Sequence, residues 1–209
     1  MTVGGNGRGP TSERRVLDFY ETAPWQTRAL LKHVPEIEGM IVEPCAGDLS
    51  IVNVLRRERG LEVTSNDIDV SKVTDMHMDA TGSVFWSMVA DRCDWVVSNT
   101  PYKMPDCLTI VQHAVATAKV GVALMLRISF TEPTAHIHPR GPWLEVNPPK
   151  RQLVLPRYSF TQNGRSDSAT TCWFVWSRKR LGGLPIVSLY NADIIYATVP
   201  EIEEGARHA

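Results

Sequence analysis

The sequence predicts an α/β fold in which helices cover a mostly parallel sheet that ends in an antiparallel hairpin. Two observations predict it. Over residues 40–126, short apolar runs alternate with segments of helical periodicity, which is the pattern of a parallel sheet wrapped by helices. Near the end, two strand-like runs at 151–156 and 170–177 have no helix between them, and the linker contains Asn163-Gly164, which favours a hairpin.

Seven strands are predicted, the third just before Asp79 and the others at 40–43, 61–65, 94–98, 120–126, 151–156 and 170–177. Helices are predicted at 50–59, from residue 71, at 83–90 and at 106–119. Ser50 and Asp106 suit N-terminal caps, and Gly60 suits a helix end. The run at 120–126 is almost wholly apolar, as expected for a strand covered on both faces.

The domain organisation follows from length and composition. A chain of 209 residues can form one α/β domain with a sizeable core, predicted here over 13–200. The Gly-rich start, 1–12, is predicted to be a disordered tail, and the polar end, 201–209, a frayed one. Residues 131–150 contain five prolines, so an irregular insertion is expected there.

Charge and cysteine content narrow the function. The formal net charge is −1, but from Arg127 to Arg180 nine Lys and Arg stand against three Asp and Glu, which is compatible with a phosphate-facing surface or with scattered solvated charges. The four cysteines are far apart, with no metal-ligand spacing, and no signal peptide or long apolar span is seen. We therefore expect a cytoplasmic protein without membrane or metal.

The segment Asn99-Thr100-Pro101-Tyr102 directly follows the apolar run at 94–98. It brings together an amide oxygen, a backbone carbonyl, a rigid kink and an aromatic face, because Pro101 fixes its own φ and biases Thr100 away from helix. This set suits gripping a planar group that carries an NH2. Alone, it also fits a strand that ends in an ordinary proline turn.

Polar residues follow the other predicted strands. Ligands of doubly wound sheets bind at the carboxyl ends of the strands. There, Gly47 allows close approach of a ligand, Asp67 can hold ribose hydroxyls, and Asp79 can accept a hydrogen bond from an adenine amino group. Each residue could instead serve a turn or a helix cap.

These motifs, in this order, resemble those of S-adenosylmethionine-dependent methyltransferases, and most closely of small phage- or prophage-type DNA N6-adenine methyltransferases. Glu43-Pro44-Cys45-Ala46-Gly47 is similar to the cofactor loop, and Asn66-Asp67-Ile68-Asp69 to the acidic motif after the second strand. Asn99-Thr100-Pro101-Tyr102 resembles the Asn/Asp-Pro-Pro-Tyr catalytic motif. The segment 18–25 is similar to the one that closes over the methionine part of the cofactor.

The resemblance covers roughly residues 17–177 and implies a Rossmann-like methyltransferase fold. It implies S-adenosylmethionine as cofactor and a flipped adenine of duplex DNA as acceptor, with the catalytic residues Asn99, Thr100, Pro101 and Tyr102. The implied cofactor-binding residues are Tyr20, Thr22, Pro24, Glu43, Pro44, Ala46, Gly47, Asp67 and Asp79. Candidate nucleic-acid contacts are Arg127, Arg140, Lys150, Arg151, Arg157 and Arg165.

The chain departs from the family pattern at Leu49, where Gly is frequent, and at Thr100, where Pro is usual. Three hypotheses remain open at this point. The first is a DNA N6-adenine methyltransferase. The second is a methyltransferase of RNA or of a protein glutamine, and the third is an inactive or regulatory cofactor-binding protein. The oligomeric state and the recognition site do not follow from the sequence.

Overall fold

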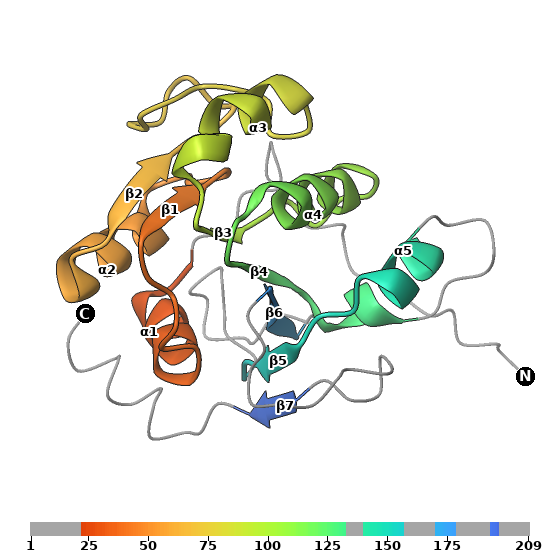
Figure 1. Ribbon diagram of the computed structural model, residues 1–209. Coiled ribbons are helices and arrows are strands. Elements are labelled where there is room, and N and C mark those ends of the chain that lie inside the picture. The colour runs from red at the N-terminus through yellow and green to blue at the C-terminus, as the bar shows by residue number, and fades with distance from the viewer. Residues whose placement is uncertain (1–21, 133–139, 157–169, 179–192, 197–209) are drawn as a thin grey trace, which may run out of the picture.

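A computed structural model describes residues 22–132, 140–156 and 170–178 together with the backbone of 193–196 (Figure 1). The predictions for the two tails, for Tyr20 and for the hairpin linker with Arg157 and Arg165 lie outside these residues. Within the described parts, no helix is long and apolar enough to cross a membrane.

The centre of the molecule is a mostly parallel sheet with the strand order β2-β1-β3-β4-β6-β5-β7. Its strands are β1 (Met40–Glu43), β2 (Glu62–Ser65), β3 (Trp95–Asn99), β4 (Gly121–Arg127), β5 (Arg151–Val154), β6 (Thr171–Ser177) and β7 (Asp193–Tyr196). Strands β1 to β4 are parallel, and β6 runs antiparallel to both of its neighbours, β4 and β5. The predicted fold class and the antiparallel pair are therefore confirmed.

Helices cover both faces of the sheet (Figure 1). Helices α1 (Pro24–His33) and α2 (Ser50–Arg59) pack on one face, and α3 (Ser83–Val89), α4 (Asp106–Thr117) and α5 (Arg140–Val146) on the other. Consecutive strand residues point to opposite faces, so Ile41 joins the core under α1 and α2 while Val42 joins the core under α3 and α4. Two short 3₁₀ turns, η2 (Ala90–Arg92) and η3 (Ile128–Thr131), complete the elements.

Helix α1 is an element that the sequence patterns did not predict. Pro24 occupies its first turn, where a missing N–H costs nothing. The backbone N–H of Ala23 donates to Gln26 Oε1 at 2.9 Å, and Trp173 Nε1 of β6 donates to the Gln26 carbonyl at 2.9 Å. One hydrogen bond therefore stabilises the first turn of α1, and the other attaches this turn to the sheet.

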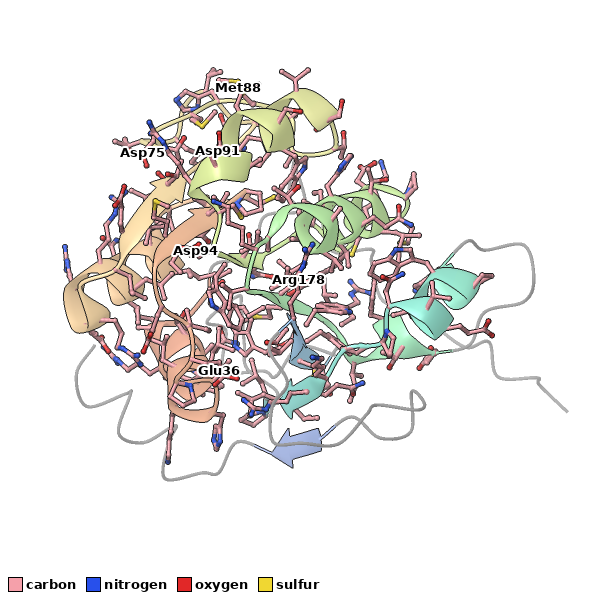
Figure 2. All side chains as sticks on the ribbon, viewed as in Figure 1. Glu36, Asp75, Met88, Asp91, Asp94 and Arg178 are labelled. Carbon is pink, nitrogen blue, oxygen red and sulfur yellow. The ribbon has the colours of Figure 1, made fainter. Side chains whose placement is uncertain are left out.

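The third predicted strand, before Asp79, and the helix predicted from Ser71 are not formed. The segment touches β2 through one isolated bridge, Asn66 to Met76. Asp75 replaces further pairing, since its Oδ2 accepts hydrogen bonds from Ser65 N at 2.8 Å and Ser65 Oγ at 2.7 Å (Figure 2 shows Asp75 beside β2). A carboxylate thus satisfies donors that a neighbouring strand would otherwise satisfy. The described sheet reaches seven strands through β7, which was not predicted and which pairs with β5.

The proline-rich stretch 131–150 is less irregular than predicted, because it contains helix α5. Pro142 lies in the first turn of α5, where proline is tolerated, and Leu144 is buried under the sheet. Trp143 packs against Trp176 of β6, with ring centroids 6.3 Å apart. Burial of Leu144 and the packing of Trp143 stabilise a helix that the number of prolines argued against.

Candidate active site

A cleft of about 860 Å³ opens at the carboxyl ends of β1 to β4. This is the edge at which parallel sheets place their ligands. The loops after β1, β2 and β3 line it together with Arg127, the last residue of β4. The described lining includes Thr22, Glu43, Pro44, Ala46, Asp67, Asp79, Asn99, Thr100, Pro101, Tyr102 and Arg127. Residues from four predicted motifs therefore meet in one place.

The loop after β1 turns sharply into α2 through two residues with left-handed backbone. Gly47 has φ +52° and Leu49 has φ +67°. A left-handed residue other than glycine costs about 1–2 kcal/mol, so Leu49 holds local strain where the similar family often has glycine. Asp48 supports the turn, because its Oδ1 accepts hydrogen bonds from Ser50 N at 3.2 Å and Ser50 Oγ at 2.8 Å. The predicted helix caps are each shifted by one residue. The N-cap of α2 is Leu49 and not Ser50, and Asp106 is the first residue of α4 and not its N-cap.

Two side chains after β2 organise the acid-bearing side of the cleft. Asp67 Oδ2 accepts from Gly47 N at 2.8 Å, and Asp67 Oδ1 accepts from Asp69 N at 2.9 Å. The buried Asn66 bonds the carbonyls of Pro44 and Met78 through Nδ2, each at 2.9 Å. These bonds join the loops after β1 and β2 to the segment before Asp79.

Glu43, the last residue of β1, is only 1% exposed. Burial is the main cause that raises the pKa of this carboxyl well above its usual value, and the neighbouring Asp48 and Asp67 raise it further. The Val52 N–H and the charge of Arg56 oppose this increase without cancelling it. Among the described residues, its Oε2 has no hydrogen-bond partner. Folding therefore favours the protonated form of the Glu43 carboxyl.

Asp79 lies on the exposed rim of the same side. Its Oδ1 accepts hydrogen bonds from Thr81 N at 2.8 Å and Thr81 Oγ1 at 2.7 Å. The residue therefore stabilises a turn and also lines the cleft, so the two interpretations of Asp79 are both compatible with the structure.

The tetrapeptide after β3 forms the other wall. Tyr102 OH donates to Asn99 Oδ1 at 2.9 Å, and Asn99 Nδ2 donates to Thr22 Oγ1 at 3.1 Å. The Arg127 guanidinium lies over the Tyr102 ring, 5.5 Å from its centroid, within cation–π range. Thr100 is buried.

The predicted basic residues do not form one group. Arg127 lines the cleft, and Arg140 follows at the start of α5, where its guanidinium lies over the Phe130 ring. Lys150 and Arg151 lie at the opposite, amino-terminal edge of the sheet, since β5 begins there. Arg151 Nη1 bonds Glu36 Oε1 at 2.8 Å and the His33 carbonyl at 3.1 Å, which is a structural ion pair away from the cleft.

Two cationic residues of the cleft, Lys72 and Lys103, were not predicted from the sequence. Lys103 directly follows Tyr102, and this position next to the tetrapeptide was a signal that it lies at the site. It was overlooked because the basic stretch was defined from Arg127 onward. The loops after β1 and β2 and the segment to Asp79 contribute mostly acids to the lining (Glu43, Asp48, Asp67, Asp69, Asp79), with Lys72 among them. Near the tetrapeptide the lining contains two cations, Lys103 and Arg127, and one acid, Asp106. No group of three or more His, Cys, Asp or Glu among the described residues could hold a metal ion.

Solved structures of known proteins share this fold. No family model and no curated protein sequence matches the chain. A type I restriction-modification system methyltransferase subunit from Streptococcus thermophilus aligns over 90% of this chain and 52% of its own, with a TM-score of 0.60 and 13% identity. The chain thus spans about half the length of that subunit.

Two further structures agree. A protein of Listeria monocytogenes described as a class I S-adenosylmethionine-dependent methyltransferase aligns over 88% of this chain and 67% of its own, with a TM-score of 0.54 and 13% identity. A Pyrococcus horikoshii protein described as an RNA methyltransferase aligns over 77% and 87%, with a TM-score of 0.50 and 14% identity. The chain therefore has a Rossmann-like methyltransferase fold.

Proposed function

We propose that this protein is an S-adenosylmethionine-dependent methyltransferase that methylates the exocyclic N6 amine of adenine in DNA. One observation carries the proposal. The amine-gripping residues Asn99 to Tyr102 and the acid-bearing loops after β1 and β2 open into the same cleft. A methyl acceptor and a nucleoside-type methyl donor would therefore meet at the carboxyl edge of the sheet.

The residues of the cofactor side fit the proposed donor. The cleft volume, about 860 Å³, lies at the upper end of the range for small-molecule sites and leaves space for a second planar group. Each Asp67 oxygen accepts one backbone hydrogen bond and retains a lone pair for a ribose hydroxyl. Asp79 would meet the cofactor's adenine, and the 43–47 loop, with Tyr20, Thr22 and Pro24, its methionine part. When bound, the cofactor supplies an electrophilic methyl group on a sulfonium.

The acceptor side supplies positioning and electrostatics. The lone pair of an adenine amine is delocalised into the ring, so the amine is a poor nucleophile. Asn99 Oδ1 and the Thr100 carbonyl would accept its two hydrogens and favour a pyramidal nitrogen with an available lone pair. Tyr102 would stack on the base, which must be rotated out of the duplex at a cost of a few kcal/mol. No side chain has to remove a proton first, because the amine proton can leave to water after transfer.

DNA is the preferred acceptor because cationic side chains lie beside the tetrapeptide and because one similar structure is a restriction-modification methyltransferase subunit. RNA is the second candidate, since the amine chemistry is the same and another similar structure is described as an RNA methyltransferase. Two alternatives remain for the experiment to distinguish from these. In the first the acceptor is a protein glutamine, and in the second the protein binds the cofactor but transfers no methyl group.

Cofactor with a labelled methyl group, offered in parallel to unmethylated DNA, RNA and cell protein, tests the proposal. We expect label in N6-methyladenine of DNA, identified by mass spectrometry of the digested product. Asn99→Ala should lower this transfer by at least about 10²-fold, as for loss of one group that stabilises a transition state, and leave cofactor binding intact. Asp67→Ala should weaken cofactor binding first.

Asn53→Ala is the matched control, because Asn53 is an exposed residue of α2 outside the cleft. Near-normal turnover of Asn99→Ala would remove Asn99 from catalysis. Label found only in RNA or only in protein would show that this macromolecule, and not DNA, is the acceptor.

A further inference from the structure

Asn99 makes contact with a residue far away in the sequence. Its Nδ2 donates to the hydroxyl of Thr22, which precedes it by 77 positions, at 3.1 Å. Thr22 is only 4% exposed and lines the cleft. The other end of the same amide, Oδ1, accepts from Tyr102 OH at 2.9 Å. Two hydroxyls thus hold the two ends of one side-chain amide.

The orientation of this amide decides what it can do. A primary amide has an acceptor oxygen on one side and a donor NH2 on the other, and rotation by 180° exchanges them. With its oxygen toward an amine, Asn99 accepts a hydrogen; with its NH2 there, donor meets donor. A carboxylate at the same position has two equivalent oxygens and no such choice. Asparagine therefore needs neighbours that fix its orientation.

The neighbours of Asn99 favour the productive orientation. A phenol hydroxyl is a better donor than acceptor, so Tyr102 favours Oδ1 on its side, and an amide oxygen has two lone pairs with which it can accept hydrogen bonds. Thr22 Oγ1 completes the arrangement by accepting from Nδ2. Thr22 itself is anchored, because the next residue, Ala23, bonds to Gln26, and Gln26 bonds to Trp173 of the sheet.

We propose that Thr22 is a positioning residue that fixes the amide orientation of Asn99, so that Oδ1 faces the methyl acceptor. The role rests on the proposed function, and it differs from the cofactor contact that the sequence resemblance implies for Thr22. A cofactor contact changes cofactor affinity, whereas a positioning contact changes the rate of methyl transfer once the cofactor is bound.

Thr22→Val removes the hydroxyl and keeps the shape of the side chain. We expect kcat at saturating cofactor to fall about tenfold, because one of the two hydrogen bonds that orient the Asn99 amide is lost, while the S-adenosylmethionine Kd from calorimetry stays unchanged. Thr22→Ser should restore kcat. A raised Kd with unchanged kcat would overturn the proposal.

Thr27→Val is the matched control. Thr27 is a fully buried threonine of α1 that does not line the cleft, and its hydroxyl has no hydrogen-bond partner among the described residues. It should leave kcat unchanged. In an Asn99→Asp background, the effect of Thr22→Val on kcat should shrink at least threefold, because a carboxylate has no wrong orientation. An undiminished effect would count against the proposal.

A measurement without turnover separates this proposal from the proposed function. In ¹⁵N-labelled protein, the Asn99 side-chain NH2 signals, assigned by their loss in Asn99→Asp, should include one proton protected from exchange. Protection should disappear in Thr22→Val and persist in Thr22→Ser. Unchanged protection in Thr22→Val overturns the positioning role whatever the acceptor is. Absence of label in DNA, by contrast, overturns only the acceptor, and the kinetic test then uses the acceptor that is labelled.

Discussion

Glu43 shows at the scale of one residue how the cleft is built at a cost in stability. The end of β1 buries a carboxyl beside Asp48 and Asp67, and burial, followed by these two charges, raises its pKa. In the unfolded chain the same group ionises near its usual value of 4.5. Above that pH the unfolded state loses a proton that the folded state keeps, so the stability of the folded state falls as pH rises.

Glu43→Gln should remove this dependence. Between pH 5 and pH 8, the free energy of unfolding of the variant should rise relative to wild type by about 1–3 kcal/mol, because the glutamine has no ionised form to be favoured in the unfolded state. Urea denaturation of both proteins at the two pH values measures it. A constant difference between variant and wild type would show that Glu43 ionises equally in both states.

How far the site could be predicted from sequence depends on the residue. Asp67 follows β2 and Asn99 ends β3, and the carboxyl ends of parallel strands share one edge, so the meeting of these two residues in one cleft was predictable. Asp79 lines the same cleft although the strand predicted before it is not formed. The contact between Thr22 and Asn99 was not, because it depends on where α1 docks. The left-handed backbone of Leu49 was not predictable either, because the sequence shows only that leucine stands where the similar family often has glycine.

At the scale of elements, side chains decide where the sheet stops. The segment before Asp79 was predicted to form the third strand, yet the Asp75 carboxylate accepts the hydrogen bonds of Ser65 instead. Arg56 of α2 supports this arrangement through Asp75 Oδ2 at 3.2 Å. Burial alone would raise the pKa of Asp75, but the hydrogen bonds from Ser65 and the charge of Arg56 outweigh burial and lower it. Strand periodicity does not reveal such a replacement.

Asp75→Ala should loosen this edge of the sheet. At pH 7 we expect the free energy of unfolding to fall by about 1 kcal/mol, a value kept small because the carboxylate is half exposed. Since the folded pKa is lowered from 3.8, the contribution is present above that pH and is lost as pH falls through the folded pKa. Unfolding curves of variant and wild type should therefore converge in strong acid; an equal gap at pH 7 and at pH 2 would contradict the role of the charge.

At the scale of the whole molecule, charge is divided between two edges of one sheet. Lys103 lies at the cleft, beside the tetrapeptide, whereas Lys150 lies at the opposite edge. Lys150 was predicted to contact nucleic acid because it belongs to the Lys- and Arg-rich stretch from Arg127 to Arg180. The folded arrangement favours Lys103 instead.

Lys103→Gln should weaken DNA binding and make it less dependent on salt. Each lysine that neutralises one phosphate contributes about 0.9 to the slope of log K against log salt concentration, so the slope should become shallower by about that amount. Lys150→Gln is the matched control and should leave the slope unchanged. Fluorescence anisotropy with a labelled duplex from 50 to 200 mM salt measures both. An equal change of the slope in the two variants would show that Lys150 contributes to DNA binding as much as Lys103 does.

Strand β6, which runs against its neighbours, has a consequence for how this scaffold can be extended. Because of its direction, Val154 at the end of β5 and Thr171 at the start of β6 lie on the same edge as Arg127, which pairs with Thr171. Chain inserted between β5 and β6 therefore departs from and returns to the mouth of the cleft. Doubling the length of such a connection costs only about 0.6 kcal/mol of closure entropy. The topology thus offers a place where a recognition module could be grafted next to the reacting groups without disturbing the core.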